Sequence, residues 1–161
     1  MEEKKFEFRY KVYSDANELK AQDQLLLAEA KRATGHAYAP YSHFYVGAAA
    51  LLINGQVVLG SNQENASFPV GMCAERVLLS TLSSLFPNMA IEAIAISYKS
   101  DQVVSDHPIA PCGICRQTLQ EFEGRVKKPI RIFLGGQEGP VYEIESASHL
   151  LPLAFTSEEL L

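Results

Sequence analysis

The stretch Val46-Gly47-Ala48-Ala49-Ala50-Leu51-Leu52-Ile53-Asn54-Gly55-Gln56-Val57-Val58-Leu59-Gly60 determines the fold class that the rest of the chain must fit. Residues 46–53 are almost wholly apolar, which is typical of a strand buried on both faces. Asn54-Gly55 predicts a type I′ turn, because that turn needs positive φ at both central residues. Residues 56–60 then return as the partner strand. This part of the chain is therefore expected to form a β-hairpin within a covered sheet.

Outward from this hairpin, helical and strand patterns alternate along the chain. Helical spacing of apolar residues predicts helices over roughly 18–35, 73–86 and 112–122. Short apolar runs predict further strands at 91–97, 130–134 and 141–144, and the tail 148–161 is expected to end in a short helix. Strands that alternate with helices, opened by a hairpin, indicate an α/β protein with a mixed sheet and helices on its faces.

The N-terminal segment has a period of two. In residues 4–12, Phe6, Phe8, Tyr10 and Val12 alternate with the charged residues Lys5, Glu7, Arg9 and Lys11. Such alternation predicts a half-buried strand. We therefore expect residues 1–17 to be an N-terminal extension that forms an edge strand.

Composition and charge limit the class of protein. The chain has 161 residues, of which 47% are hydrophobic, which suits one compact domain over residues 1–161. The net charge is −5 and no dense Lys/Arg run is present, so a small substrate is favoured over a nucleic acid polymer. The apolar run 44–53 is shorter than the roughly 20 residues that a membrane helix needs. With no apolar stretch after Met1, a secretory signal is not expected, and the protein is expected to be cytoplasmic.

Two short motifs carry the chemistry: Cys73-Ala74-Glu75 and Pro111-Cys112-Gly113-Ile114-Cys115. They match the pattern of zinc deaminases, in which a His or Cys is followed two residues later by Glu and then by Pro-Cys-x-x-Cys. Zinc prefers four tetrahedral ligands, and a catalytic site keeps one of them for water. Both motifs lie at expected helix starts, where unpaired N–H groups stabilise thiolates. We therefore expect Cys73, Cys112 and Cys115 to hold one Zn²⁺.

The residues after Cys73 suggest how such a site would work. Glu75 lies two residues beyond the first ligand, so its carboxylate can approach the metal-bound water without ligating zinc and can transfer protons. Three thiolates carry more negative charge than Zn²⁺ carries positive charge, which weakens the metal as a Lewis acid. Arg76 is the candidate that offsets this excess by donating to the thiolate sulfurs.

Two other readings of the cysteines stay open. Cys112 and Cys115 form a C-x-x-C motif, which also occurs in thioredoxin-like redox sites. A zinc-stabilised binding domain without catalysis is the other alternative, although structural zinc sites are usually closed by four protein ligands. The histidines, at 36, 43, 107 and 149, share no ligand spacing, so the three-cysteine site does not need them.

Over roughly residues 20–160 the sequence resembles the small cytidine deaminases of pyrimidine salvage. Several motifs in the same order carry the resemblance: Ala37-Tyr38-Ala39-Pro40-Tyr41-Ser42-His43-Phe44, Val46-Gly47-Ala48-Ala49, Gly60-Ser61-Asn62-Gln63-Glu64-Asn65-Ala66-Ser67, Cys73-Ala74-Glu75-Arg76, Pro111-Cys112-Gly113-Ile114-Cys115-Arg116-Gln117 and Leu150-Leu151-Pro152-Leu153-Ala154-Phe155. The three-cysteine set resembles the homotetrameric branch of this family.

The resemblance implies a three-layer α/β/α sandwich around a five-stranded mixed sheet. It implies hydrolysis of cytidine and deoxycytidine to uridine and deoxyuridine with release of ammonia, by homotetramers whose subunits share their active sites and bind one zinc each. A nucleotide or an aminated nucleoside antibiotic is the alternative substrate.

The resemblance also implies roles for individual residues. Asn62 and Glu64 match the positions that hold the sugar 3′-hydroxyl, and Phe44 matches an aromatic residue of the nucleoside pocket. The backbone near Ala74 and Glu75 would read the pyrimidine edge. Phe155 would pack on a base bound in a neighbouring subunit. Phe68 stands where the family often has Tyr, so any polar contact made by that hydroxyl is missing here.

Overall fold

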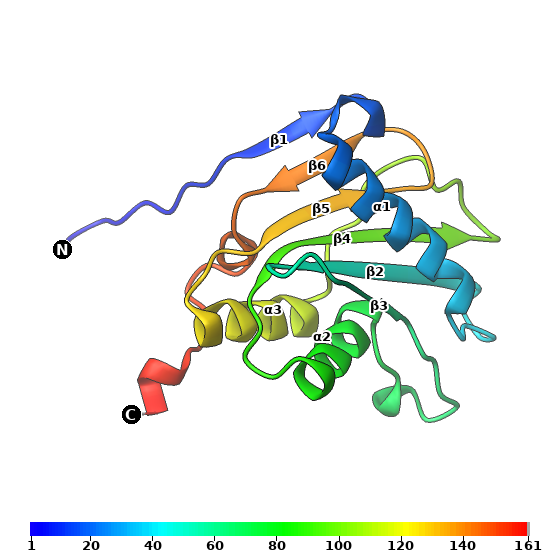
Figure 1. Cartoon of the computed structure of the whole chain (residues 1–161). Helices are drawn as coiled ribbons and strands as arrows, with labels where there is room; N and C mark the ends of the chain where they lie inside the picture. The colour runs from blue at the N-terminus through cyan, green and yellow to red at the C-terminus, as the bar shows by residue number, and fades with distance from the viewer. Residues whose placement is uncertain (161) are drawn as a thin grey trace.

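The computed structural model describes residues 1–160 and contains a six-stranded sheet (Figure 1). The strands follow the order β1-β6-β5-β4-β2-β3. Only β4 and β5 are parallel, and the other neighbours are antiparallel, so the sheet is mixed as expected. The strands are β1 (Tyr10–Tyr13), β2 (Phe44–Leu52), β3 (Val57–Ser61), β4 (Ile91–Ser100), β5 (Arg131–Gly135) and β6 (Val141–Ile144).

Helices cover both faces of this sheet. Helix α1 (Ala21–Ala33) lies on one face, and α2 (Ala74–Leu85) and α3 (Gly113–Val126) lie side by side on the other (Figure 1). Short 3₁₀ helices occupy Ala16–Glu18, Thr34–His36, Phe68–Val70, Ala147–Leu150 and Ser157–Leu160. The expected three-layer α/β/α sandwich is confirmed. Among residues 1–160, no helix is both long enough and apolar enough to span a bilayer.

The sheet separates two apolar cores, and β2 contributes to both. Ala48 and Ala50 face the core under α2 and α3, whereas Ala49 and Leu51 face the core under α1. All four side chains are buried, because successive residues of a strand point to opposite faces and both faces carry helices. The apolar run in β2 is thus explained by its central place in the sheet.

The hairpin between β2 and β3 is present, but its turn differs from the expected type. Gly55 has a φ of 85°, whereas Asn54 has no positive φ, so the turn is not type I′. The Gly55 N–H donates to the Leu52 carbonyl over 2.9 Å, and the Leu52 N–H donates to the Gln56 carbonyl over 2.9 Å. This is the three-residue hairpin in which a tight turn is followed by one left-handed residue, and only that residue needs to be glycine.

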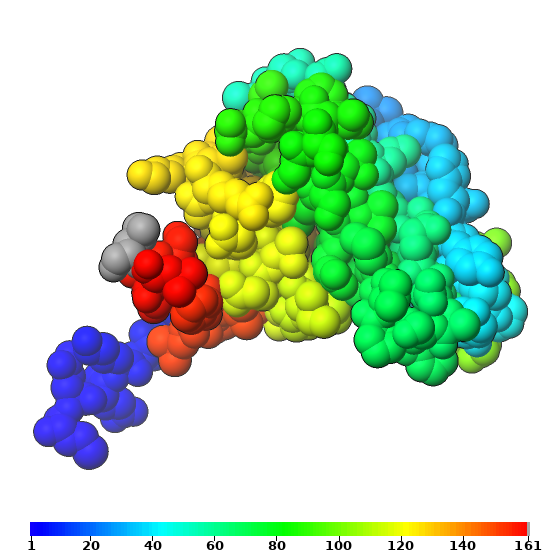
Figure 2. Space-filling model, turned by 90° about the horizontal axis from the view of Figure 1, so that it is seen from below, coloured from blue at the N-terminus to red at the C-terminus, as the bar shows by residue number. Residues whose placement is uncertain are grey.

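The N-terminal segment departs most from expectation. It supplies the sixth strand, where five were expected, and this strand covers only Tyr10–Tyr13 at the edge of the sheet. Phe6, Phe8, Tyr10 and Val12 are exposed, so the prediction of a half-buried strand over residues 4–12 was wrong. The period-two pattern is real, but no element of this chain covers its apolar face. Figure 2 shows the first residues projecting from the body of the molecule.

Candidate metal and active site

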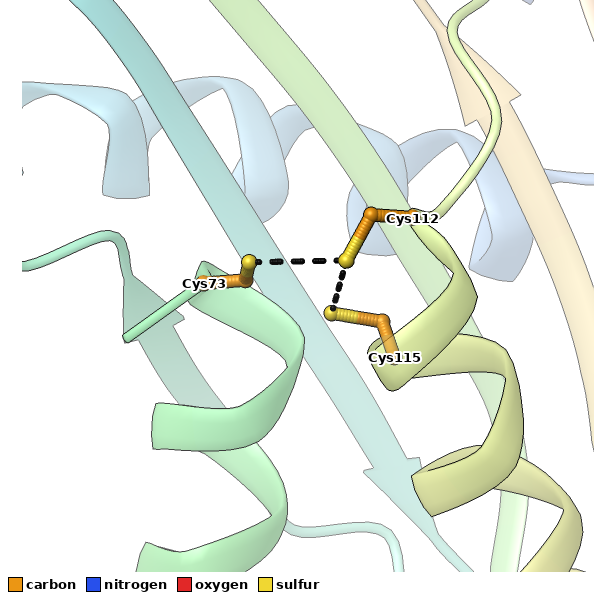
Figure 3. A group of neighbouring side chains, drawn as sticks. All are labelled: Cys73, Cys112 and Cys115. Carbon is orange, nitrogen blue, oxygen red and sulfur yellow. Dashed lines mark hydrogen bonds between the residues drawn. The ribbon is translucent and has the colours of Figure 1, made fainter. Parts of the chain in front are cut away.

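The three cysteines come together at the N-termini of two adjacent helices. Cys73 is the N-cap residue of α2, Cys112 is the N-cap residue of α3, and Cys115 lies in the first turn of α3. Their sulfurs point toward one another (Figure 3). The Sγ atoms of Cys73 and Cys112 are 3.7 Å apart, those of Cys112 and Cys115 are 3.5 Å apart, and all three lie within 4.8 Å of one another.

These separations fit a zinc ion. Zn–S bonds of about 2.3 Å at tetrahedral angles place two sulfur ligands roughly 3.8 Å apart. The same separations are far longer than the roughly 2.05 Å of a disulfide, which argues against an oxidised Cys112–Cys115 pair in this structure. Among residues 1–160, no fourth His, Cys or carboxylate lies that close to all three sulfurs. The protein therefore offers three ligands and leaves one tetrahedral position open.

Local hydrogen bonds prepare the site for a cation. A hydrogen bond from the Cys115 thiol, with contributions from Cys112 and from the positive charge of Arg76, lowers the pKa of Cys73 to about 6, although partial burial acts in the opposite direction. The same pairing raises the pKa of Cys115. Cys73 is therefore the first thiol of the group to lose its proton, and a thiolate is the form that binds a metal.

Glu75 is a buried acid beside this cluster. It lies in the first turn of α2, and only 4% of its surface is exposed. Burial raises the pKa of its carboxyl group above the usual range, because a low-dielectric surrounding disfavours the charged form. A carboxyl group whose pKa moves toward neutrality can both accept and return a proton, which is the property of a general acid–base.

A cavity of about 590 Å³ opens beside the cluster, which is a size suited to a small organic ligand. The cavity is formed by β2, the loop after β3, and the starts of α2 and α3. Six of the residues singled out from the sequence line it: Phe44, Asn62, Glu64, Cys73, Glu75 and Cys112. Because these residues come from four separated segments, the fold brings the motifs into one site.

The polar end of the cavity is rigid. The Asn62 amide donates to the Phe44 carbonyl over 2.9 Å and accepts from the Val46 N–H over 2.7 Å. Glu64 accepts from the Tyr41 N–H over 2.9 Å and from the N–H and hydroxyl of Ser42. Desolvation acts to raise the pKa of Glu64, but these hydrogen bonds outweigh it and hold the pKa below the usual range. Glu64 is therefore an oriented carboxylate at neutral pH.

Two residues that support the site were not identified from the sequence. Ser42 fixes Glu64, although it belongs to a motif that was noted. Tyr98 of β4 is buried and stacks under Phe44, with ring centroids 5.1 Å apart and an angle of 16° between the planes. Sequence spacing carries no signal for this second pair, because it depends on the pairing of β2 with β4.

Two residues singled out from the sequence lie outside the lining of the cavity. The Ala74 side chain is fully buried beneath β3. Phe155 is 59% exposed, and its carbonyl accepts a hydrogen bond of 2.8 Å from Gln117 of α3. Phe68 does line the cavity, although it is largely exposed. The cavity of a single chain is thus formed without Phe155.

The three-layer fold, the open three-thiolate site and the buried carboxylate beside it define a zinc-dependent deaminase. The sequence profile described as "Cytidine and deoxycytidylate deaminase zinc-binding region" matches residues 20–130, well over half of the chain. The chain belongs to this family, and its cofactor is one zinc per subunit.

Individual relatives agree with this assignment. A cytidine deaminase of Halalkalibacterium halodurans is 39% identical over 137 residues, which are 85% of this chain and 96% of that protein. The crystal structure of cytidine deaminase from Burkholderia pseudomallei is 40% identical, covers 81% of this chain and 97% of its own, and superposes with a TM-score of 0.70. The structure from Mycobacterium tuberculosis is 31% identical, covers 84% and 98%, and has a TM-score of 0.65.

Proposed function

We propose that this protein hydrolyses cytidine and deoxycytidine to uridine and deoxyuridine, releasing ammonia, in pyrimidine salvage. The observation that carries the proposal is the cavity, which joins the cysteine cluster and Glu75 to the oriented pair Asn62 and Glu64. One end offers the groups that hydrolysis needs, and the other offers hydrogen bonds to a sugar. The similarity to proteins named cytidine deaminase supports the same substrate class.

In this proposal Cys73, Cys112 and Cys115 hold the zinc ion. When bound, zinc supplies a Lewis acid that lowers the pKa of a coordinated water from about 15.7 toward roughly 7. Glu75 accepts a proton from the attacking water and delivers protons to the pyrimidine ring and to the departing amino group, so that water is consumed and ammonia leaves. Arg76 offsets the charge of the thiolates, as its effect on the pKa of Cys73 supports.

The rest of the cavity selects a free nucleoside. Asn62 keeps one amide hydrogen, and Glu64 keeps lone pairs, for the sugar 3′-hydroxyl. Phe44, held by its stacking partner, lines the pocket of the base. The backbone at Ala74 and Glu75 would read the pyrimidine edge. Because Glu64 carries a negative charge, a phosphate nearby would be repelled, which favours a nucleoside over the alternative nucleotide.

We also propose that residues 1–161 form one deaminase domain, with residues 1–17 as an extension, and that four copies assemble into a homotetramer with shared active sites. Phe155 would then pack on a base in a neighbouring subunit. Its exposure and its position outside the cavity of its own chain support this role. The cytoplasm is the proposed location, because free cysteines suit a reducing compartment.

The decisive experiment is an ultraviolet assay on cytidine with the variant Glu75→Gln. We expect this variant to keep its zinc and to lose activity by a factor of about 10²–10⁴, the usual contribution of a general acid–base. Glu145→Gln, at an exposed position, is the matched control and should keep full activity.

Three outcomes would contradict parts of the proposal. Unchanged turnover in Glu75→Gln would remove this residue from the mechanism. Full activity after zinc chelation would exclude the metal, and would favour redox chemistry at Cys112 and Cys115. A higher kcat/KM on deoxycytidylate than on cytidine would replace the nucleoside by the nucleotide.

A further inference from the structure

The N-terminal segment carries an uncovered aromatic surface. Phe6, Phe8, Tyr10 and Val12, here called the aromatic stripe, are 55%, 38%, 50% and 59% exposed. Neighbouring rings already contact one another, with centroids 6.4 Å apart for Phe6 and Phe8 and 6.2 Å apart for Phe8 and Tyr10. The stripe is therefore a continuous apolar face on a segment that leads away from the body of the molecule (Figures 1 and 2).

The same segment ends in a strand with a free edge. Strand β1 is the last strand of the sheet and pairs through one edge with β6, from Tyr10 opposite Ile144 to Tyr13 opposite Val141. Within residues 1–160, no strand pairs with its other edge. Glu143 anchors β1, since it accepts from the Tyr13 hydroxyl over 2.6 Å and from the Lys11 ammonium over 3.2 Å. A fixed edge strand with unpaired backbone groups is a template for a further strand.

The charges between the aromatic residues indicate which strand fits. If the segment pairs antiparallel with a second copy of itself, with Phe8 opposite Phe8, then Glu7 of each copy faces Arg9 of the other. In the same register each Phe6 faces a Tyr10, an aromatic cross-strand pair of the kind that stabilises sheets. The like-charged Lys5 and Lys11 also face each other, but within one chain Lys5 pairs with Glu7 and Lys11 pairs with Glu143. A uniformly acidic or basic partner would leave charges of one sign unmatched.

We propose that the free edge of β1, continued through residues 4–9, docks antiparallel on the same segment of a second copy, with the two-fold axis at Phe8. Each copy would cover the aromatic stripe of the other. The two or three half-exposed rings per copy bury on the order of 100 Å² each, which is less than the roughly 800 Å² per partner of a standard stable interface. The contact is therefore weak on its own and depends on concentration. It lies at the sheet edge opposite β3, so it is independent of the proposed function and of subunit contacts at the cavity.

Cysteine cross-linking tests the register in the full-length, zinc-loaded protein. In an antiparallel pair, opposite Cα atoms are 4.5–5.5 Å apart, which suits a disulfide. Phe8→Cys should therefore form a disulfide-linked dimer on mild oxidation, at least about tenfold faster than Arg9→Cys, whose two copies would be offset along the strands. The wild-type chain gives the background from the native cysteines. No cross-link at position 8, or equal rates at both positions, would overturn the proposal.

A charge exchange tests the pairing of Glu7 with Arg9 in the Phe8→Cys background. Glu7→Arg or Arg9→Glu alone places like charges opposite each other twice, so the rate of dimer formation should fall by about tenfold at low salt. The double variant restores both opposite-charge pairs and should recover the original rate. If either single variant cross-links as fast as its parent, or if the double variant stays slow, the register is wrong.

Discussion

Gly60 is the position at which β3 touches the first two turns of α2. A Cβ atom at Gly60 would lie 2.5 Å from the Ala74 carbonyl oxygen, 2.5 Å from the Leu78 nitrogen and 2.7 Å from the Leu78 Cβ. Ordinary contacts to a Cβ begin at 3.4 Å, so α2 would have to recede by about 0.9 Å in Gly60→Ala. Two of the three contacts are backbone atoms, so no change of rotamer relieves the clash. Such overpacking typically costs about 1–3 kcal/mol of unfolding free energy.

The same shift would reach the active site, because Ala74 lies between Cys73 and Glu75. Moving the start of α2 separates Cys73 from Cys112 and Cys115, which belong to α3. A misplacement of about 1 Å can lower an enzymatic rate by roughly 10²-fold. We therefore expect Gly60→Ala to lose stability, to bind zinc more weakly and to lose at least about tenfold in kcat for cytidine.

Three measurements check this prediction: urea unfolding, zinc affinity by chelator competition, and the ultraviolet assay. Gly124→Ala is the matched control, because a Cβ at Gly124 meets nothing within 4 Å. Since Gly124 lies inside α3, alanine should stabilise that helix by about 0.5–1 kcal/mol and leave zinc affinity unchanged. A Gly60→Ala protein with the stability, zinc affinity and activity of the wild type would refute the reasoning.

Three further predictions concern charge. Arg76→Ala should weaken zinc retention or raise the pH at which activity appears, and chelator competition with a pH–rate profile would reveal neither effect if Arg76 does not act on the thiolates. Arg131→Met should cost about 3 kcal/mol in urea unfolding, because it leaves the buried Asp23, now paired at 3.0 and 3.1 Å, without its cation; a loss below about 0.5 kcal/mol would contradict this. The hydrogen bond to Glu143, together with burial, raises the pKa of Tyr13 from 10.0 to about 12, so its contribution to stability is complete below pH 10 and is lost as pH rises through about 12. Tyr13→Phe should lack this alkaline loss, and unfolding curves that fall equally with pH in both proteins would disprove it.

Much of the fold follows from local sequence pattern. The run in β2, the stripe of α1 and the apolar pattern of β4 and β5 each reflect the burial of one segment, and a periodicity of 2 or 3.6 records such burial directly. Boundaries and turn geometry were less accessible. The hairpin turn was expected to need positive φ at both Asn54 and Gly55, but one extra loop residue removes that need at Asn54.

The residues expected at the metal site could be named because each motif is short. A Glu two residues after Cys73, and a pair of cysteines spaced by two residues at a helix start, combine residue types that ordinary surfaces or cores do not require together. The supporting residues Ser42 and Tyr98 have no such signal, since each acts on a partner that is distant along the chain or across the sheet.

The sequence alone determined that this chain alternates strands and helices, and that three cysteines and a glutamate are its chemical residues. Only the tertiary structure decided that the sulfurs lie 3.5 and 3.7 Å apart, that Glu75 is buried, and that one cavity joins them to Asn62 and Glu64. It also decided that the aromatic stripe is exposed. The physical reason is that a periodic pattern shows that two faces of a segment differ, whereas the packing of distant segments determines what each face meets.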